Sequence, residues 1–234
     1  MHIALLVTNT DDSAFAARHP GDGEKFDQLL RSQRPDWQVS LFDLPQQGFP
    51  ESLDTFDGFL IGGSPASVHD DAPWIARLAP LVRQIVAGGQ PLFGACFGHQ
   101  AIAVALGGTV ARNPGGWVLG VTDTTMDGAA PWIAGDGGPV RMNAAHLEQV
   151  TRLPAGATVI GGNADCPVGS FRIGAKVFTT QYHPEMTPDF IEALVEELAP
   201  TLPPGVADRA RASLNQPAER DRVAGWIVRF FEQG

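Results

Sequence analysis

Cysteine and long apolar runs are both scarce in this 234-residue sequence. Its two cysteines, Cys96 and Cys166, are too few for a disulfide framework, so we expect a chain that folds without cross-links in a reducing, cytoplasmic environment. Glycine, proline or a charged residue interrupts every apolar run well before the roughly 18 residues that a membrane helix needs. The first residues, MHIALLVTNT, lack the basic start and long apolar run of a secretory signal. No membrane partner is expected.

Positive charge is also in short supply. The sequence has 16 Lys and Arg against 26 Asp and Glu, which gives a formal net charge of −10 and an isoelectric point near 4.9. A nucleic acid would therefore have to bind against the field of the whole molecule, and we expect no such partner. With 44% hydrophobic residues the composition is that of a globular domain and excludes extended disorder.

Short apolar runs alternate with segments of helical periodicity, and no internal repeat is visible. Strands are predicted at residues 2–7, 38–43, 58–61, 90–95, 158–161 and 176–182, and helices at 24–34, 74–87 and 99–106. Strands that alternate with helices form parallel sheets covered on both faces. The sequence therefore predicts an open, mostly parallel, twisted α/β sheet of the flavodoxin-like type.

Two regions depart from this alternation. Residues 110–142 contain Gly-Gly, Asp-Gly and threonine-rich stretches, which favour a small antiparallel excursion. Beyond His183 the pattern becomes helical, first at 187–198 and then at 207–231. We expect a single domain over residues 1–234, with a helical C-terminal extension from about residue 187.

The segment QPLFGACFGHQAIAVALGG at residues 90–108 predicts a strand that runs through a tight turn into a helix. It has the form of a nucleophile elbow, G-x-nucleophile-x-G, with Cys96 at its centre and glycines at positions 94 and 98. The helix start would favour a thiolate on Cys96 and offer the Phe97 N–H to an oxyanion. A buried structural cysteine before a glycine-flanked helix fits the same residues.

A cysteine nucleophile needs a base and a group that orients it. His183 is the best candidate for the base, because it ends a predicted strand in the segment QYHPE, and Pro184 biases it to an extended conformation. Glu185 can then turn back towards the imidazole. The alternative is an exposed strand end with a solvated glutamate. His99 and His146 are weaker candidates that can line a pocket, and the other three histidines have no recognisable partner.

A third feature follows the predicted strand 58–61, where Gly62 and Gly63 precede Ser64 and Pro65. Glycines at the end of a strand let a backbone N–H approach a ligand closely, as the second half of an oxyanion hole requires. An ordinary glycine-rich turn is the alternative. All three features fall at predicted strand ends, where open α/β sheets bind their ligands.

Together, GGSPASV, GACFGHQ followed by ALGG, and YHPE resemble the class I, or triad-type, glutamine amidotransferases from Met1 to about Glu185. The resemblance implies hydrolysis of the glutamine side-chain amide through a thioester, with no cofactor and no metal. It implies that Cys96 is the nucleophile, His183 the base and Glu185 its orienting partner, with Gly63 and Phe97 as oxyanion donors. Substrate-binding positions implied by the same resemblance are Gly62, Gln100, Ser170 and Phe171.

The chain departs from the family pattern at two positions. Val168 stands where a polar residue is usual, and Val118 stands where the family often has glutamate. No synthetase module is visible in the sequence, so we expect either a stand-alone glutaminase or one that delivers ammonia to a separate synthetase subunit. Two alternatives to a glutaminase are open. The same triad could hydrolyse other γ-glutamyl amides or peptides, or the chain could be a catalytically silent binding subunit.

Overall fold

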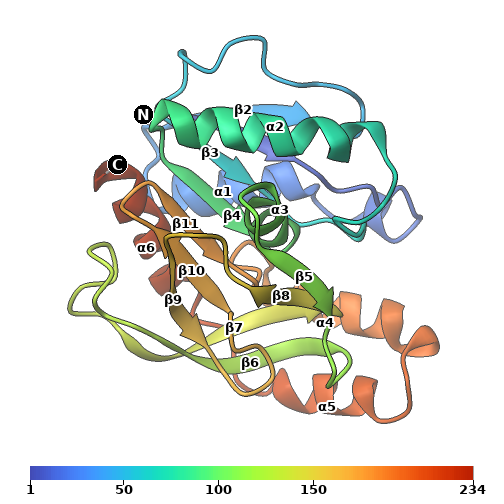
Figure 1. Cartoon of the computed structure of the whole chain (residues 1–234). Coiled ribbons are helices and arrows are strands. Elements are labelled where there is room, and N and C mark those ends of the chain that lie inside the picture. The colour runs from blue at the N-terminus through green and yellow to red at the C-terminus, as the bar shows by residue number, and fades with distance from the viewer. Residues whose placement is uncertain (234) are drawn as a thin grey trace.

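A nine-stranded mixed sheet forms the centre of the protein (Figure 1). The structure is a computed structural model, and it describes residues 1–233. The strands are β1 (His2–Val7), β2 (Gln38–Asp43), β3 (Gly58–Ile61), β4 (Leu92–Ala95), β6 (Val118–Met126), β7 (Gly138–His146), β9 (Ala157–Gly162), β10 (Ser170–Ile173) and β11 (Val177–Thr180). Their order is β2-β1-β3-β4-β11-β10-β9-β6-β7. A separate antiparallel pair joins β5 (Thr109–Arg112) to β8 (Glu148–Arg152).

The large sheet has a parallel and an antiparallel part. Strands β2, β1, β3, β4 and β11 pair in parallel, which confirms the predicted open α/β sheet. From β11 onward, β10, β9, β6 and β7 pair antiparallel. The predicted antiparallel excursion therefore exists but is larger than expected. It includes β10, for which the sequence analysis predicted no strand.

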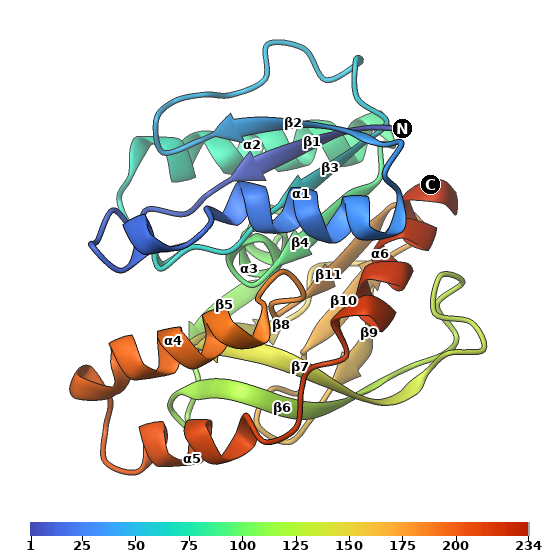
Figure 2. The ribbon, with the colours of Figure 1, turned by 180° about the vertical axis from the view of Figure 1, so that it is seen from behind.

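Helices cover both faces of the sheet. They are α1 (Asp22–Gln33), α2 (Pro73–Gly88), α3 (Phe97–Ala105), α4 (Pro188–Leu198), α5 (Val206–Ser213) and α6 (Arg220–Gln233), with short 3-10 turns η1 (Ala16–Arg18) and η2 (Ala199–Thr201). Side chains of β1 alternate between two cores, as a period of two requires. Ile3 and Leu5 face α1 and α6, whereas Ala4 and Leu6 face α2 and α3. Figure 2 shows α1 and α6 in front of the sheet, on the face opposite α2.

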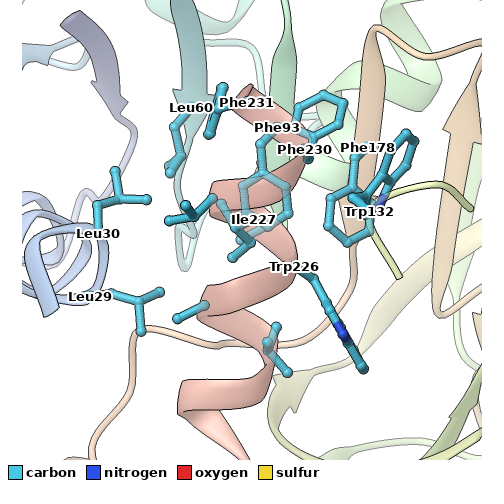
Figure 3. Close-up of a cluster of buried hydrophobic side chains, with 14 of the residues drawn as sticks. Leu29, Leu30, Leu60, Phe93, Trp132, Phe178, Trp226, Ile227, Phe230 and Phe231 are labelled. Atoms are coloured by element: carbon cyan, nitrogen blue, oxygen red, sulfur yellow. The ribbon is translucent and has the colours of Figure 1, made fainter. Parts of the chain in front are cut away.

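Helix α6 completes one of these cores. Its Trp226, Ile227, Phe230 and Phe231 are buried between α1 and the strands, close to Leu29 and Leu30 on one side and Phe93 and Phe178 on the other (Figure 3). Burial of a large aromatic side chain contributes about 2–3 kcal/mol. The C-terminal helix is therefore an integral part of the domain core.

One prediction for the C-terminal region is wrong. The helical pattern at 207–231 is two helices, α5 and α6, separated by residues 214–219. Pro217 lies in this break, and a proline inside a helix removes a hydrogen bond and clashes with the preceding turn. In Figure 2, α4 and α5 lie below the parallel strands, away from α6. Within residues 1–233, no helix has both the length and the apolar character to cross a lipid bilayer.

Candidate active site

Cys96 stands at a strained turn between β4 and α3. Its backbone has φ 50° and ψ −105°, a conformation that costs a non-glycine residue of order 1–3 kcal/mol. The flanking glycines permit this turn by close approach: a Cβ on Gly98 would lie 2.3 Å from the carbonyl oxygen of Ile61, and one on Gly94 would lie 2.7 Å from the Gly98 carbonyl carbon. The predicted elbow geometry is thus present, with the cysteine side chain almost entirely buried.

His183 and Glu185 form a buried pair just beyond β11. The imidazole Nδ1 donates to Glu185 Oε1 at 2.6 Å, and both side chains are at most 6% exposed. Burial alone would lower the pKa of His183, but the negative charges of Cys96 and Glu185 outweigh it and hold the pKa well above its ordinary value. Within residues 1–233 the other ring nitrogen, Nε2, has no hydrogen-bond partner. It is therefore free to exchange a proton.

Two distant side chains hold the segment that carries this pair. The Asn143 side-chain amide donates to the Met186 carbonyl at 2.8 Å, and the His183 N–H donates to the Asn143 carbonyl at 2.8 Å. From the start of α6, the Arg220 guanidinium donates to the carbonyls of Pro184 and Glu185 at 3.2 and 3.1 Å. Strand β7 and helix α6 therefore fix the orientation of the imidazole and carboxylate.

Two backbone amides near Cys96 have no acceptor. Across residues 1–233, neither the Gly63 N–H nor the Phe97 N–H makes a backbone hydrogen bond. Thr8, at the end of β1, donates its hydroxyl to the carbonyls of Gly62 and Gly63 at 3.1 and 2.9 Å, which orients this turn. A Cβ on Gly63 would lie 2.9 Å from His183 Cε1 and 3.8 Å from Cys96 Cβ, so only glycine fits between them.

Two linked side-chain amides lead to the Cys96 sulfur. Gln181 Nε2 donates to Cys96 Sγ at 3.6 Å, and its Oε1 accepts from Gln100 Nε2 at 3.1 Å. Gln100 Nε2 also donates to the Glu148 carbonyl at 2.9 Å. Gln181 is a residue that the sequence analysis did not single out.

Two cavities meet at Cys96. The larger, of about 260 Å³, is called the polar cavity and is lined by Ser64, Pro65, Ala66, Ser67, Cys96, Gln100, Arg112, Trp117, Ala145, His146, Leu147 and Glu148. The other, of about 180 Å³, is called the apolar cavity and is lined by Asn9, Asp11, Phe15, Asp22, Gly63, Ser64, Pro65, Cys96, Trp117, Ala145, His183, Met186, Phe190, Leu194 and Leu198. His183 lines only the apolar cavity, and Gln100 lines only the polar one.

His146 gives the polar cavity a hydrogen-bond acceptor. Its Nδ1 donates to the Glu148 carbonyl at 3.1 Å, which leaves Nε2 of the neutral ring as an acceptor. Burial lowers the pKa of His146 to about 4, so the ring is neutral at pH 7. Among residues 1–233, this buried Nε2 has no partner. Arg112 brings a positive charge to the same cavity, and Glu148, which accepts from the Ser67 hydroxyl at 2.8 Å, brings a negative one.

Residues 28–193 match the family model for class-I glutamine amidotransferases, which covers most of the chain. The chain belongs to this family. Gamma-glutamyl peptidase 3 of Arabidopsis thaliana is 28% identical over 230 residues, which cover 94% of this chain and 91% of that protein. The GMP synthase [glutamine-hydrolyzing] of Leifsonia xyli is 32% identical over 135 residues, 55% of this chain and 26% of that protein.

Solved structures agree on the fold of this amidotransferase-family chain. The crystal structure of a glutamine amidotransferase from Thermotoga maritima gives a TM-score of 0.77 at 17% identity, and the alignment covers 99% of this chain and 96% of that one. A glutamine amido transferase from Methylobacillus flagellatus gives 0.74 at 22% identity, with 99% and 92% covered. The family resemblance seen in the sequence is confirmed.

Most of the residues that the sequence analysis selected lie together. Cys96, His183, Glu185, Gly63 and Phe97 meet at the carboxyl ends of β3, β4 and β11, and Gln100 lines the polar cavity. Gly62 supports the elbow, because its carbonyl accepts from the Gly98 N–H at 3.0 Å.

Ser170 and Phe171 have a different setting. Both are fully buried and line neither cavity: Ser170 donates to the Thr180 hydroxyl at 3.1 Å, and the Phe171 ring packs at 5.0 Å from that of His99. Their substrate contacts stay a prediction from the family resemblance. His99 itself is buried, its Nδ1 pairs with the Thr179 hydroxyl at 2.8 Å, and burial lowers its pKa to about 3.

The sequence analysis did not predict several residues that line the two cavities. Trp117 lines both of them, Glu148 lines the polar cavity, and Phe15, Phe190 and Leu194 line the apolar cavity. Among these residues, only Trp117 had a signal in the sequence: it is the aromatic residue of GGWVLG at residues 115–120, which resembles the family element in which Val118 stands where glutamate is frequent. No cluster of three or more potential metal ligands is present among residues 1–233.

Proposed function

We propose that this protein hydrolyses the γ-amide bond of γ-glutamyl compounds, with glutamine as the smallest member of that class, through a thioester on Cys96. The observation that carries the proposal is the strained Cys96 beside the buried His183–Glu185 pair, at the point where two cavities meet. Backbone strain of this kind is retained where a nucleophile must be exposed to its substrate. A structural cysteine would need no such turn.

The reaction begins with attack of the Cys96 thiolate on the γ-carbonyl carbon. The resulting oxyanion accepts hydrogen bonds from the N–H groups of Gly63 and Phe97, which have no other acceptor in residues 1–233. His183 Nε2 then gives its proton to the amide nitrogen as the C–N bond breaks, which releases the amine and leaves the thioester. Glu185 stabilises the imidazolium in the steps in which His183 is charged and holds the neutral ring in place between them.

Water completes the cycle. His183, now neutral, takes a proton from a water molecule as the oxygen attacks the thioester carbonyl. The C–S bond breaks, the thiolate of Cys96 reforms, and glutamate leaves with its γ-carboxylate. The imidazolium and thiolate are then restored as the starting pair, so that no cofactor enters the balance.

The polar cavity suits the glutamyl half of the substrate. An α-amino acid headgroup presents one carboxylate and one ammonium close together. Arg112 offers a positive partner for the carboxylate, while His146 Nε2 and the Gln100 Oε1, which accepts no protein hydrogen bond within residues 1–233, suit the ammonium. Opposite charges on Arg112 and Glu148 therefore match a zwitterion.

The apolar cavity supports a substrate class wider than glutamine. Ammonia is the only leaving group in glutamine hydrolysis, and it needs far less than the roughly 180 Å³ available beside His183. A relative of this chain is named a gamma-glutamyl peptidase, which is consistent with a larger leaving amine. Delivery of ammonia to a separate synthetase stays a prediction from the family resemblance.

A covalent trapping experiment tests the proposal. A glutamine analogue with a diazoketone in place of the amide should add once per chain at pH 6–7, and peptide mapping should place the adduct on Cys96. Glutamine should protect, and asparagine, one methylene shorter, should protect less. The Cys166→Ala variant serves as a matched control that labels normally. Labelling that saturating glutamine fails to slow would contradict a glutamine-binding site beside Cys96. No labelling and no hydrolysis of any γ-glutamyl amide would show a catalytically silent binding subunit instead.

A further inference from the structure

The apolar cavity lies on the amine side of Cys96. Its lining includes His183, whose Nε2 must reach the departing nitrogen, whereas Arg112, His146 and Gln100 line only the polar cavity. A substrate that places its glutamyl headgroup in the polar cavity must therefore direct its amine substituent into the apolar cavity. This assignment rests on the proposed function.

Hydrophobic side chains form the inner wall of this cavity. Met186, Phe190, Leu194 and Leu198 come from the segment that leads into and through α4, and Phe15 faces them from the turn before η1. The rings of Phe15 and Phe190 lie 5.8 Å apart. Methylene groups next to the scissile nitrogen would be removed from water here, which favours an aliphatic substituent on that nitrogen.

The apolar cavity adjoins a third cavity of about 590 Å³, called the acidic cavity. The two share Asn9, Asp11, Phe15, Asp22 and Phe190 in their linings. The acidic cavity is also lined by Asp12, Glu24 and Asp43. None of Asp11, Asp12, Glu24 and Asp43 forms an ion pair within residues 1–233.

The one lysine in this region is already neutralised. Lys25 Nζ lies 2.8 Å from Asp22 Oδ1 and 3.4 Å from the centre of the Phe190 ring, and the residue is only 5% exposed. The second Asp22 oxygen accepts from the Asn9 side-chain amide at 2.9 Å. Lys25 therefore offers no free charge to a carboxylate on a ligand, and the field in the acidic cavity stays negative.

We propose that the apolar and acidic cavities together bind a leaving amine that has an aliphatic stem and ends in a second, positively charged amino group. The stem contacts the α4 wall, and the terminal ammonium lies among the unpaired carboxylates of the acidic cavity. Along this path the α-carboxylate of a leaving amino acid would meet the unpaired carboxylates of the acidic cavity. Lys25 is already paired with Asp22, and the remaining basic side chain in the lining is His19, whose ring packs 4.6 Å from that of Phe15 and 5.2 Å from that of Phe190. The substrates are thus γ-glutamyl derivatives of diamines in preference to γ-glutamyl peptides.

Three synthetic substrates, each with five carbon atoms in its amine half, test this preference. They are the γ-glutamyl amides of 1,5-diaminopentane, of pentylamine and of 5-aminopentanoate, which end in a cation, a methyl group and a carboxylate. We expect kcat/KM to fall in that order, with the cationic substrate preferred over the anionic one by about tenfold or more at low salt. The preference should shrink at 0.5 M salt, because exposed carboxylates are screened.

A charge-neutralising variant locates the effect. Asp11→Asn should reduce the ratio of kcat/KM for the cationic over the anionic substrate by about threefold. Asp71→Asn makes the same charge change at an exposed residue outside all three cavities, and it should leave that ratio as in the parent protein.

The outcomes separate the inference from the function on which it rests. Equal rates for the three amides, or a preference for the carboxylate, would overturn the inference while γ-glutamyl hydrolysis stands. Hydrolysis of glutamine with none of the three amides cleaved would also overturn it. If neither glutamine nor any amide is hydrolysed, the proposed function fails as well. Equal effects of Asp11→Asn and Asp71→Asn would show that the whole-molecule charge, not this cavity, sets the preference.

Discussion

The polar and apolar cavities share Cys96 and four other lining residues, Ser64, Pro65, Trp117 and Ala145, but their remaining walls come from different parts of the chain. Strands β5, β7 and β8 bring Arg112, His146 and Glu148 to the polar cavity, and α4 brings Phe190 and Leu194 to the apolar one. The reacting groups between them come from the ends of parallel strands. Under the proposed function, the ends of the parallel strands supply the reacting groups, while β5, β7, β8, α4 and the segment around Phe15 line the sites for the two halves of the substrate.

Removal of the Cys96 sulfur, which borders both cavities, should abolish hydrolysis of every substrate. Cys96→Ala removes the nucleophile, so we expect at least a 10³-fold loss of hydrolysis for every γ-glutamyl substrate, measured as release of glutamate. Cys166→Ala is the matched control and should stay within about threefold of the parent protein. Burial raises the pKa of Cys166 to about 12, which keeps its thiol protonated and unreactive. Normal turnover by Cys96→Ala would disprove the mechanism.

Substitution of His183 or Glu185 should cause the second-largest loss of activity, and the loss should be the same for all γ-glutamyl substrates. His183→Ala should lose about 10²-fold or more, and Glu185→Gln less, because the glutamate acts only through the imidazole. The Glu185 charge helps to hold the pKa of His183 well above its usual value. In the proposed mechanism, activity needs the imidazolium and falls as pH rises through that pKa, so in Glu185→Gln the alkaline limb of the pH–rate profile should move to lower pH.

That shift also separates an orienting role from a purely structural one. An unchanged alkaline limb in Glu185→Gln, with a normally folded protein by circular dichroism, would contradict coupling between the carboxylate and the imidazole. If His99→Ala or His146→Ala loses more activity than His183→Ala, the base has been assigned to the wrong histidine.

Substitutions in the polar cavity should raise KM by the same factor for all γ-glutamyl substrates, whichever amine they release. Arg112→Met removes the cation proposed to bind the substrate α-carboxylate, and KM should rise about tenfold for glutamine and for the pentylamide alike. Arg152→Met is the control, because Arg152 is exposed at the other end of the β5–β8 pair and lines no cavity near Cys96. An effect confined to one of the two substrates would assign Arg112 to the amine half instead.

Substitutions in the apolar cavity should affect only substrates that release an amine larger than ammonia. Leu194→Glu places a carboxylate against the aliphatic stem, so kcat/KM for the γ-glutamyl pentylamide should fall about fivefold relative to glutamine. Ala193→Glu adds the same charge one residue earlier on α4, outside the cavity lining, and should leave this ratio unchanged. A uniform loss on both substrates would show that the α4 wall does not contact the amine.

Local sequence motifs predicted the reacting groups but not the cavities around them. The elbow at Cys96 and the His183–Glu185 pair each lie within five or six consecutive residues, whose spacing and glycines already limit the backbone. The cavity walls instead join Phe15 to Phe190 and Gln100 to Glu148, contacts that only tertiary packing creates. The same reason explains why β10 was missed: its four residues gain their extended form from pairing with β9 and β11.

The smallest effect is expected from the titration of His146. Its pKa of about 4 keeps the ring neutral well below pH 6.5, so the proposed acceptor at Nε2 should persist in mildly acidic solution. In the inactive Cys96→Ala background, the calorimetric Kd for glutamine should therefore change by less than about twofold between pH 7.5 and 5.5. His146→Gln in that background provides the reference without a titrating ring. If the imidazole instead titrated at its ordinary 6.5, its protonation would repel the substrate ammonium and weaken binding about tenfold by pH 5.5, while the glutamine variant stayed flat. Such a difference between the two profiles would show that His146 is not held neutral and would remove it from the proposed recognition of the glutamyl headgroup.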